Sequence, residues 1–315
     1  MIREMKRQHP DMSVQELCRS LGVSRQAHYR QAHRSERVLQ GLTEVVELVR
    51  GIRATQPKLG GGKLYTILAP RIAALPVAFG RDRFFELLSR EGLTLRKRKR
   101  RVRTTMSRHG LPVYRDLVKG RQVNAPGQVW VADITYWPVR EGFYFIFLIT
   151  DACSRKIIGH QVARGMSGEH ALAALRMAQK YSPHALSGII HHSDRGKQYC
   201  FGQYVRQLMQ AGMQISMTES SDPRDNAVAE RVNGTLKNEL LAHHNVHDID
   251  QARQLLDDAV HIYNTQRPHL SCDLQYPEQA HRLDHGLNRR WKHRPYKGTV
   301  NLLQDQAGVV NSPQE

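Results

Sequence analysis

Three acidic residues in the second half of a strongly basic chain have the types and spacing for metal-dependent chemistry. Asp133 lies in the apolar, β-branched segment WVADITYW, where a carboxylate is costly unless a neighbour neutralises it. Asp194 ends the apolar segment IIHHSD, and strand ends are where α/β sheets place ligand sites. Glu230 follows in a helical segment. Three converging carboxylates repel one another unless divalent cations lie between them, so the sequence predicts a site for Mg²⁺, with Mn²⁺ as a substitute.

Such a site points to phosphoryl chemistry. Two ions about 4 Å apart can activate an attacking hydroxyl and stabilise the leaving oxygen at a phosphodiester. No serine or cysteine has the partner pattern of a nucleophile, and no tyrosine lies in a recombinase signature. We therefore predict that Asp133, Asp194 and Glu230 are catalytic and metal-binding, with two ions per site and no organic cofactor. Any one of these acids taken alone would be read as an ordinary surface or capping residue, and the prediction rests on the three together.

Histidines and cysteines offer no second metal site. His191 and His192 are neighbours in a predicted strand, so they point to opposite faces and do not suit one ion. The cysteines are scattered without a CxxC pair, which argues against a zinc knuckle and against a disulfide framework. They are Cys18, Cys153, Cys200 and Cys272.

The charge balance points to a polyanionic partner. The 315 residues include 47 Lys and Arg against 29 Asp and Glu, a net charge of +18, and DNA and RNA are the commonest partners of such chains. The plain alternative is a merely soluble basic protein. A hydrophobic content of 40% excludes wholesale disorder. The longest apolar run, Phe143–Ile149, is too short to cross a bilayer, and the N-terminus lacks a secretion signal. We expect a cytoplasmic, nucleoid-associated protein without membrane contact.

The elements around the three acids form an α/β pattern. Predicted strands are QVWVADITYWPV, FYFIFLITDAC, KIIGHQVA, SGIIHHSD and MQISMT, and helices are expected near 169–179, 203–211 and 225–241. The order β-β-β-α-β-α-β-α is that of the ribonuclease-H fold.

The last of these helices has two faces. Its apolar stripe, which should pack on the sheet, consists of Val228, Val232, Leu236 and Leu240. Its polar face presents Glu230 together with Asn226, Asn233 and Lys237.

Two segments N-terminal to the sheet suggest DNA contact. In the first, Ser13 and Glu16 form a capping-box pattern, Gly22 breaks the first helix and Ser24 can cap a second, which describes a helix-turn-helix. The residues leading its second helix would enter the major groove: Arg25, Gln26, Tyr29 and Arg30. A helical hairpin for protein contact is the alternative.

The following region reads as further helices, with a turn at Gly60–Lys63 and a helix over Arg81–Arg90. A dense basic run then follows, each residue of which can neutralise one phosphate. The candidate DNA contacts in this run are Arg96, Lys97, Arg98, Lys99, Arg100, Arg101 and Arg103. A solvated hinge is the alternative. We predict five regions: a helix-turn-helix at 1–35, a second helical DNA-binding region at 36–95, a basic linker at 96–122, a catalytic core at 123–285 and a basic tail at 286–315.

Together these motifs resemble the DDE transposases of bacterial insertion sequences, within the retroviral-integrase superfamily, and above all the downstream-frame product of the IS-three family. The resemblance rests on WVADITYW, HHSDRGKQY, DNAVAERVNGTLKNEL and YNTQRPHLSCDLQYPEQA, and on the thirty-five residues between Asp194 and Glu230. It runs from about residue 128 to 280, and the N-terminal helices also fit.

The resemblance implies an α/β, ribonuclease-H-like integrase core behind an all-α helix-turn-helix region. It implies binding of the element's terminal inverted repeats, Mg²⁺-dependent cleavage that frees a 3′-hydroxyl, and strand transfer by that hydroxyl into target DNA. Asn226, Arg231 and Lys237 are the candidate DNA contacts near the cut. A homo-oligomer on DNA and a helper protein from an upstream reading frame are the expected partners. Two other readings stay open, a DNA-binding regulator with an inactive integrase-like fold and a ribonuclease-H-type nuclease.

Overall fold

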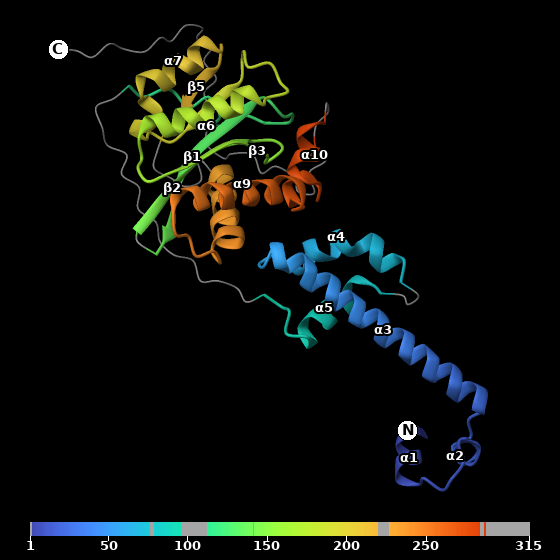
Figure 1. The fold of residues 1–315 in the computed structure, drawn as a ribbon. Coiled ribbons are helices and arrows are strands. Elements are labelled where there is room, and N and C mark those ends of the chain that lie inside the picture. Colours follow the sequence, from blue (N-terminus) through green and yellow to red (C-terminus); the bar gives the residue numbers. More distant parts are fainter. Residues whose placement is uncertain are drawn as a thin grey trace, which may run out of the picture. The chain divides into compact units, whose positions relative to one another are not determined.

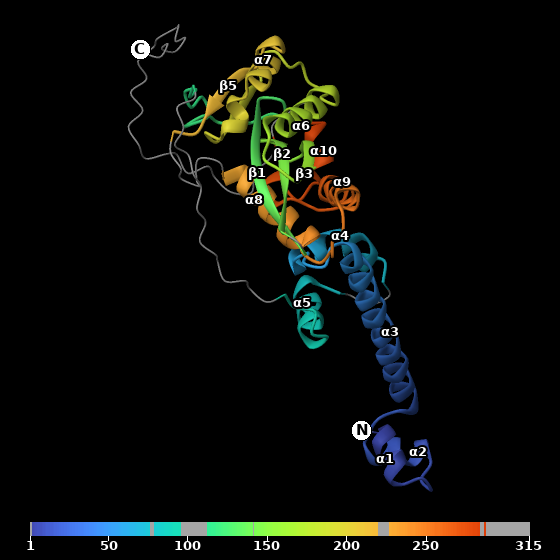
Figure 2. The ribbon, with the colours of Figure 1, turned by 60° about the vertical axis from the view of Figure 1, so that its left-hand side comes forward.

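The protein forms two compact units, Met1–Lys97 and Arg98–Glu315. The structure is a computed structural model that describes residues 2–75, 79–95, 112–140, 142–219, 227–283 and 287 (Figures 1 and 2). The basic linker up to residue 111, Asn226 and nearly all of the tail from 284 lie outside the described residues. Within the described ranges, no helix is both long and apolar enough to cross a membrane.

The first unit is helical, as predicted. Its helices are α1 (Ile2–Gln8), α2 (Val14–Ser20), α3 (Arg25–Thr55), α4 (Gly61–Ala73) and α5 (Arg81–Arg90). Two buried clusters hold them: one joins α1 and α2, and the other joins the second half of α3 to α4 and α5.

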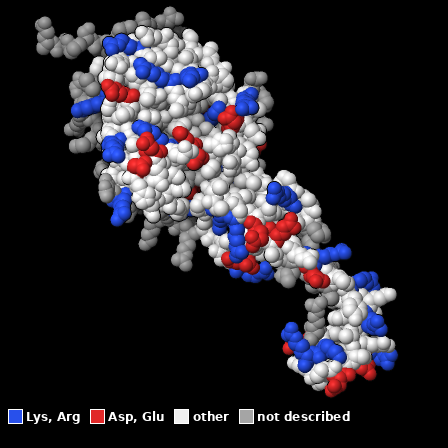
Figure 3. Space-filling model, in the orientation of Figure 1, with Lys and Arg blue, Asp and Glu red and all other residues white. Residues whose placement is uncertain are grey.

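The predicted helix-turn-helix signals are confirmed in local detail. The Ser13 hydroxyl accepts a hydrogen bond from the Glu16 backbone at 3.2 Å, and the Glu16 carboxylate accepts one from the Ser13 backbone at 2.8 Å. Gly22 ends this turn with φ +66°, a conformation that favours glycine. Ser24 then caps α3, accepting a hydrogen bond from Ala27. On the face shown in Figure 3, Lys and Arg side chains lie at several points of this end of the chain, and a group of acidic side chains lies at its edge.

The second helix of this motif is much longer than predicted. α3 has 31 residues and continues through residues 35 and 36, because no glycine or proline interrupts it there. The predicted turn at Gly60–Lys63 is wrong: Gly60 caps α4, and the residues after it form the first turn of that helix. The close packing of α4 against α5 requires a glycine at position 61, because a Cβ atom there would lie 2.9 Å from the Phe85 ring. The predicted helix over Arg81–Arg90 is confirmed.

The second unit is a five-stranded mixed sheet with helices on both faces. Its strands are β1 (Val129–Val139), β2 (Gly142–Asp151), β3 (Ile157–Ala163), β4 (Ile190–Ser193) and β5 (Gln214–Met217), in the order β3-β2-β1-β4-β5. The helices are α6 (Gly168–Lys180), α7 (Gly202–Gln210), α8 (Ala227–Thr235), α9 (Ile249–Thr265) and α10 (Pro277–His281). Short turns follow β4, α8 and α9: η1 (Lys197–Cys200), η3 (Leu236–Leu241) and η4 (Leu270–Cys272).

Strand pairing fixes which residues lie side by side. β1 and β2 form an antiparallel hairpin from Trp130↔Asp151 to Val139↔Gly142, whereas β1 pairs in parallel with β4 only from Val129↔Ile190 to Val131↔His192. The outer half of the hairpin therefore runs past the end of β4, and Figures 1 and 2 show it extending beyond the rest of the sheet.

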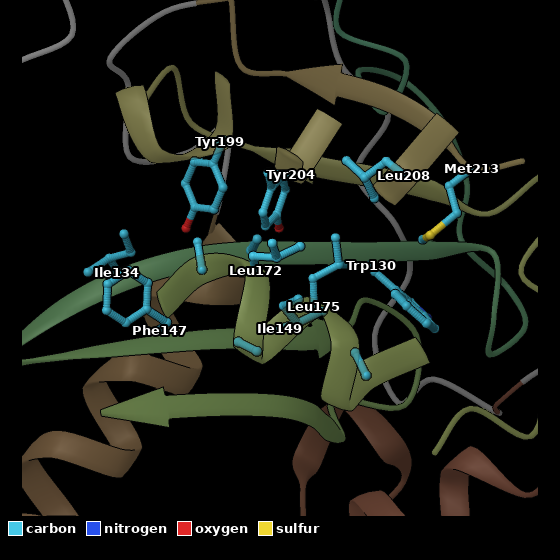
Figure 4. Close-up of a cluster of buried hydrophobic side chains, with 14 of the residues drawn as sticks. Trp130, Ile134, Phe147, Ile149, Leu172, Leu175, Tyr199, Tyr204, Leu208 and Met213 are labelled. Carbon is cyan, nitrogen blue, oxygen red and sulfur yellow. The ribbon is translucent and has the colours of Figure 1, made fainter. Parts of the chain in front are cut away.

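The two sheet faces carry separate cores. One is covered by α6 and α7, and Figure 4 shows Tyr199 and Tyr204 over this face with Ile134 and Phe147 beside them. The other is covered by α8, η3 and α9. The close packing of α6 requires Gly159 on β3, since a Cβ atom there would lie 2.2 Å from the Ala174 carbonyl oxygen. This topology is the ribonuclease-H-like integrase architecture, so the predicted fold class is confirmed.

Candidate active site

Asp133 lies in the middle of β1 on the face that α8 covers. Its side chain is 9% exposed, and the alternation of β1 places it between Val131, below α8, and Trp137, in the core beside α9. The Asn233 amide of α8 donates a hydrogen bond to Asp133 Oδ2 at 2.5 Å. A carboxylate in this apolar setting is thus held in place by a side chain of the facing helix.

Asp194 follows β4 at the position beside Asp133. The last parallel pair is Val131↔His192, and two residues further along both chains lie Asp133 and Asp194. Because residues two apart in a strand share a face, this register, if continued one residue past the end of β4, would direct both acids to the same side. The Gly196 backbone N–H donates to Asp194 Oδ1 at 3.0 Å, which fixes the carboxylate just beyond the strand end.

Glu230 is carried by α8, whose polar side lies against β1. One turn after Glu230, Asn233 reaches Asp133, and one turn later Lys237 Nζ donates to Thr135 Oγ1 at 3.0 Å. The predicted apolar stripe of this helix is also confirmed, because Val232 and its successors at four-residue intervals are buried against the sheet. The helix thus presents its Glu230 side to the strand that carries Asp133.

The helix does not continue as one α-helix to residue 241, as the sequence predicts. It changes after Thr235 into a single π-helical turn, η3, which holds both Lys237 and Glu239. The Glu239 carboxylate accepts a hydrogen bond from Arg267 Nη2 at 2.6 Å, and only 6% of the Arg267 side chain is exposed. The turn after the Glu230 helix is therefore fastened to β1 on one side and to the segment behind α9 on the other.

The negative charges of Asp133 and Asp194 both act on the Tyr199 phenol. Burial, and after it the negative charges of Asp194 and Asp133, raise the pKa of the Tyr199 phenol well above its ordinary value. Tyr199 therefore stays a neutral hydroxyl.

The three acids are not gathered into a finished metal site. Among the residues that the structure describes, no three His, Cys, Asp or Glu side chains are grouped so that they could hold a metal ion. The structure brings Asp133 and Asp194 to neighbouring positions of the sheet and Glu230 to the facing helix, while the joining of all three carboxylates around cations stays a prediction. One observation fits a missing ligand: the buried Asn233 Oδ1 finds no hydrogen-bond partner within the described part of the chain.

The segment after β5 is anchored beside this site. Arg195, next to Asp194, donates to the Thr218 and Glu219 carbonyl oxygens at 2.8 and 2.7 Å. Lys119 pairs with the Glu219 carboxylate at 2.5 Å, and this contact lowers the pKa of Glu219. These contacts fix the chain at Thr218 and Glu219. The candidate Asn226 belongs to residues 220–226, which lie outside the described residues.

The remaining candidate DNA contacts are placed differently. The four residues predicted to enter the major groove are exposed at the start of α3: Arg25, Gln26, Tyr29 and Arg30. Arg231 on α8 is exposed, whereas Lys237 on η3 is half-buried and bonded to Thr135. The basic run from Arg96 to Arg103 lies outside the described residues.

His191 and His192 serve the sheet separately, in agreement with the prediction. His191 Nε2 is 2.7 Å from the Tyr204 hydroxyl on one face, and His192 Nδ1 is 2.9 Å from Ser216 Oγ. Burial lowers the pKa of His191 to about 3, so it is neutral at physiological pH.

Sequence reasoning did not single out Thr135 or Tyr199. Thr135 could have been found from the period-two alternation, since it is the next residue on the Asp133 face. Tyr199 gives no such signal, because its place near the acids depends on how the turn η1 folds back over the sheet.

Known proteins match both the sheet and the segments that carry these residues. A family profile described as an integrase core domain matches residues 123–223, and a second integrase core profile matches residues 211–277. The fold and the site thus define a protein with an integrase core.

The chain is 37% identical over 259 residues to the uncharacterized 31 kDa protein of insertion element IS600 from Shigella sonnei, covering 80% of this chain and 93% of that protein. It is 28% identical over 288 residues to transposase InsF of insertion sequence IS3A from Escherichia coli K12, covering 87% and 96%. The catalytic core domain of HTLV-2 integrase, solved in complex with magnesium, aligns with 50% of this chain and 97% of that one at 17% identity and a TM-score of 0.40. The chain belongs to the IS-three family of insertion-sequence transposases, in the integrase superfamily.

Proposed function

We propose that this transposase binds the terminal inverted repeats of its element and catalyses DNA strand cleavage and strand transfer at Asp133, Asp194 and Glu230. The observation that carries the proposal is the register of β1 and β4, which puts Asp194 beside Asp133, with the Glu230 helix facing them. The interval of thirty-five residues between the last two acids supports the same assignment.

The donor set fits divalent cations. Carboxylate oxygens are hard ligands of the kind that Mg²⁺ and Mn²⁺ prefer, and the Asn233 amide oxygen adds another oxygen close to Asp133. We assign Asp133, Asp194 and Glu230 as the residues that would hold two such ions. When bound, the ions would supply positive charge at the scissile phosphodiester and ease deprotonation of the attacking hydroxyl.

The chain's own residues prepare this chemistry. The Asn233 amide and the Gly196 N–H hold Asp133 and Asp194 in place by hydrogen bonds of 2.5 and 3.0 Å. Lys237 holds a positive charge next to Asp133 through its bond to Thr135 and can turn toward a phosphate. Arg231, exposed on α8, offers a second cation for the DNA backbone.

DNA recognition is assigned to the first unit and the basic linker. The exposed residues at the start of α3 would contact base edges, and the run from Arg96 to Arg103 would neutralise phosphates. Because joining two DNA ends requires two sets of contacts, we propose a homo-oligomer on DNA, with an upstream-frame helper protein as a further partner.

The acids are tested by Asp133→Asn, Asp194→Asn and Glu230→Gln in the full chain, with the surface change Asp257→Asn on α9 as the matched control. We expect each of the three to abolish Mg²⁺-dependent cleavage and joining of a labelled terminal-repeat duplex while leaving DNA affinity within about threefold. Strand transfer retained by any of the three would remove that residue from the site. A wild-type chain that binds but never cuts would favour the regulator, and cutting of RNA–DNA hybrids alone would favour the nuclease.

The linker is tested separately by salt dependence. Replacing the seven basic residues of 96–103 by glutamine should weaken DNA binding and flatten the plot of log affinity against log salt, by roughly 0.9 in slope for each phosphate that the variant no longer neutralises. An unchanged slope would mean that this run does not touch phosphates.

A further inference from the structure

Three aromatic side chains gather on one face at the outer end of the β1–β2 hairpin: Tyr136, Phe143 and Phe145, here called the hairpin aromatic cluster. Tyr136 is 48% exposed and Phe143 56% exposed. The Tyr136 ring centroid is 5.2 Å from that of Phe145 and 6.2 Å from that of Phe143, the latter pair at an interplanar angle of 82°.

The cluster is the uncovered end of a buried strip. On the same face, further back along the hairpin, Ile134 and Phe147 are buried in the core below α6, as Figure 4 shows. The hairpin continues past this cover, so its last aromatic rings face solvent. Large aromatic rings left exposed together, instead of being replaced by polar residues, mark an interaction surface.

The cluster lies next to the proposed active site. Tyr136 is three residues after Asp133, about 10 Å along the strand. Beyond Asp133 the β4 side of β1 has no strand partner within the described residues, because β4 ends at Ser193. A DNA strand with its phosphate at Asp133 could therefore pass this edge of β1 and bring a neighbouring nucleotide over Tyr136, on the opposite face.

We propose that the hairpin aromatic cluster stacks unpaired nucleobases of the DNA strand next to the phosphodiester that is cut. This inference rests on the proposed function, since it places the DNA at Asp133. Aromatic rings bind any base through its π face, and one stacked base strengthens binding by on the order of ten- to a hundredfold. Cleavage near the end of a duplex would benefit, because unpaired bases let the backbone bend into the site.

The surroundings favour nucleic acid over a second copy of the chain. Arg140 is exposed in the hairpin turn, and exposed Arg164 directly follows Ala163, the strand partner of Phe145. These cations suit phosphates beside stacked bases and would repel their own copies. Three partly exposed rings also offer far less than the roughly 800 Å² per partner that a stable protein interface buries.

The experiment compares the chain with an unaltered hairpin, here called wild type, with Phe143→Ala and with Tyr136→Ala/Phe143→Ala. All three proteins carry Glu230→Gln so that no DNA is cut. The control is Tyr181→Ala, which removes a ring that is 67% exposed at the end of α6. Fluorescence anisotropy measures affinity for a mixed-sequence single-stranded oligonucleotide and for the matching duplex. Phe143→Trp, which keeps a stacking surface, is the conservative variant.

We expect at least a tenfold loss of single-strand affinity in the double variant, a smaller loss in Phe143→Ala, duplex affinity within twofold, and no loss in the control or in Phe143→Trp. Equal single-strand affinities of wild type and double variant would overturn the proposal. So would a double variant that dissociates an oligomer in sedimentation, since the face would then be a contact between copies. Cleavage of terminal-repeat duplex by the chain without Glu230→Gln is measured apart, so that failure of the transposase assignment is distinguishable from failure of the stacking site.

Discussion

The ion pair between Glu239 and Arg267 should make the two partners unequally sensitive to mutation. The Arg267 side chain is 6% exposed and the Glu239 side chain 30%. Besides the 2.6 Å bond to Glu239, Arg267 Nε and Nη1 are buried and meet no acceptor among the described residues. Within the described part of the chain, Glu239 is therefore the one carboxylate that forms an ion pair with the buried Arg267 guanidinium.

Glu239→Gln leaves that guanidinium buried without a countercharge, which costs about 3–5 kcal/mol of unfolding free energy. Arg267→Met leaves a glutamate that can turn toward water, and methionine fills much of the vacated volume, so we expect a loss below about 2 kcal/mol. The double change Glu239→Leu/Arg267→Met removes both charges and should recover most of the loss.

Urea unfolding followed by tryptophan fluorescence measures these differences, because Trp130 and Trp137 are both buried in the integrase core. The matched control is Arg253→Gln, which breaks an exposed pair with Asp250 on α9 and should leave the midpoint unchanged. The reasoning is refuted if Arg267→Met costs as much as Glu239→Gln, or if neither differs from the control.

Three further outcomes are expected. Gly159→Ala should lose about 3 kcal/mol in the same unfolding assay, because its methyl group would overlap a backbone carbonyl of α6, whereas Gly165→Ala, with open space around it, should lose nothing. Burial lowers the pKa of His191 to about 3 from an ordinary value of 6.5, so its contribution to stability is complete above pH 6.5 and falls as the pH drops toward 3; His191→Phe should flatten this part of the stability profile, and an unaltered profile would show that the imidazole is not shielded. Lys237→Met should reduce the salt slope of DNA binding by about one while Thr135→Val leaves it unchanged, and equal slopes in all three proteins would take Lys237 off the DNA.

Much of the fold follows from local patterns in the sequence. The strands of the core are apolar, β-branched runs bounded by turns, and the helix over Arg81–Arg90 is bounded by Gly80 and by Gly92, whose φ is +66°. Ser13 and Glu16 predict their own capping box, because both partners of that motif lie within four residues. In each of these cases a short segment contains all the contacts that decide its structure.

The π-helical turn after the Glu230 helix was missed, although the sequence holds a trace of it. The apolar residues Val228, Val232, Leu236 and Leu240 recur every four residues. An α-helix has 3.6 residues per turn, so such a stripe drifts around the helix unless one wider turn restores it. The length of α3 was missed for a different reason: the expected end near residue 35 has no helix-breaking residue.

The sequence predicts the residue types of the candidate site and one of its sequence intervals, the one from Asp133 to Asp194. The sixty-one positions from Asp133 to Asp194 equal the register offset of β1 and β4, but only strand pairing shows that this offset joins them. The bonds of Asp133 to Asn233 and of Thr135 to Lys237 depend on how α8 crosses the sheet, which no local pattern encodes.

That register has a consequence for how the gene can vary. Residues added or deleted in the loops between β3 and α6, or between α6 and β4, lengthen or shorten the interval between the first two aspartates without displacing either, since each is held by its own strand. One residue deleted within β1 before Asp133 would instead turn its carboxylate to the opposite side of the sheet. Natural variants of this transposase should therefore accumulate length changes in those connections and none inside the strand.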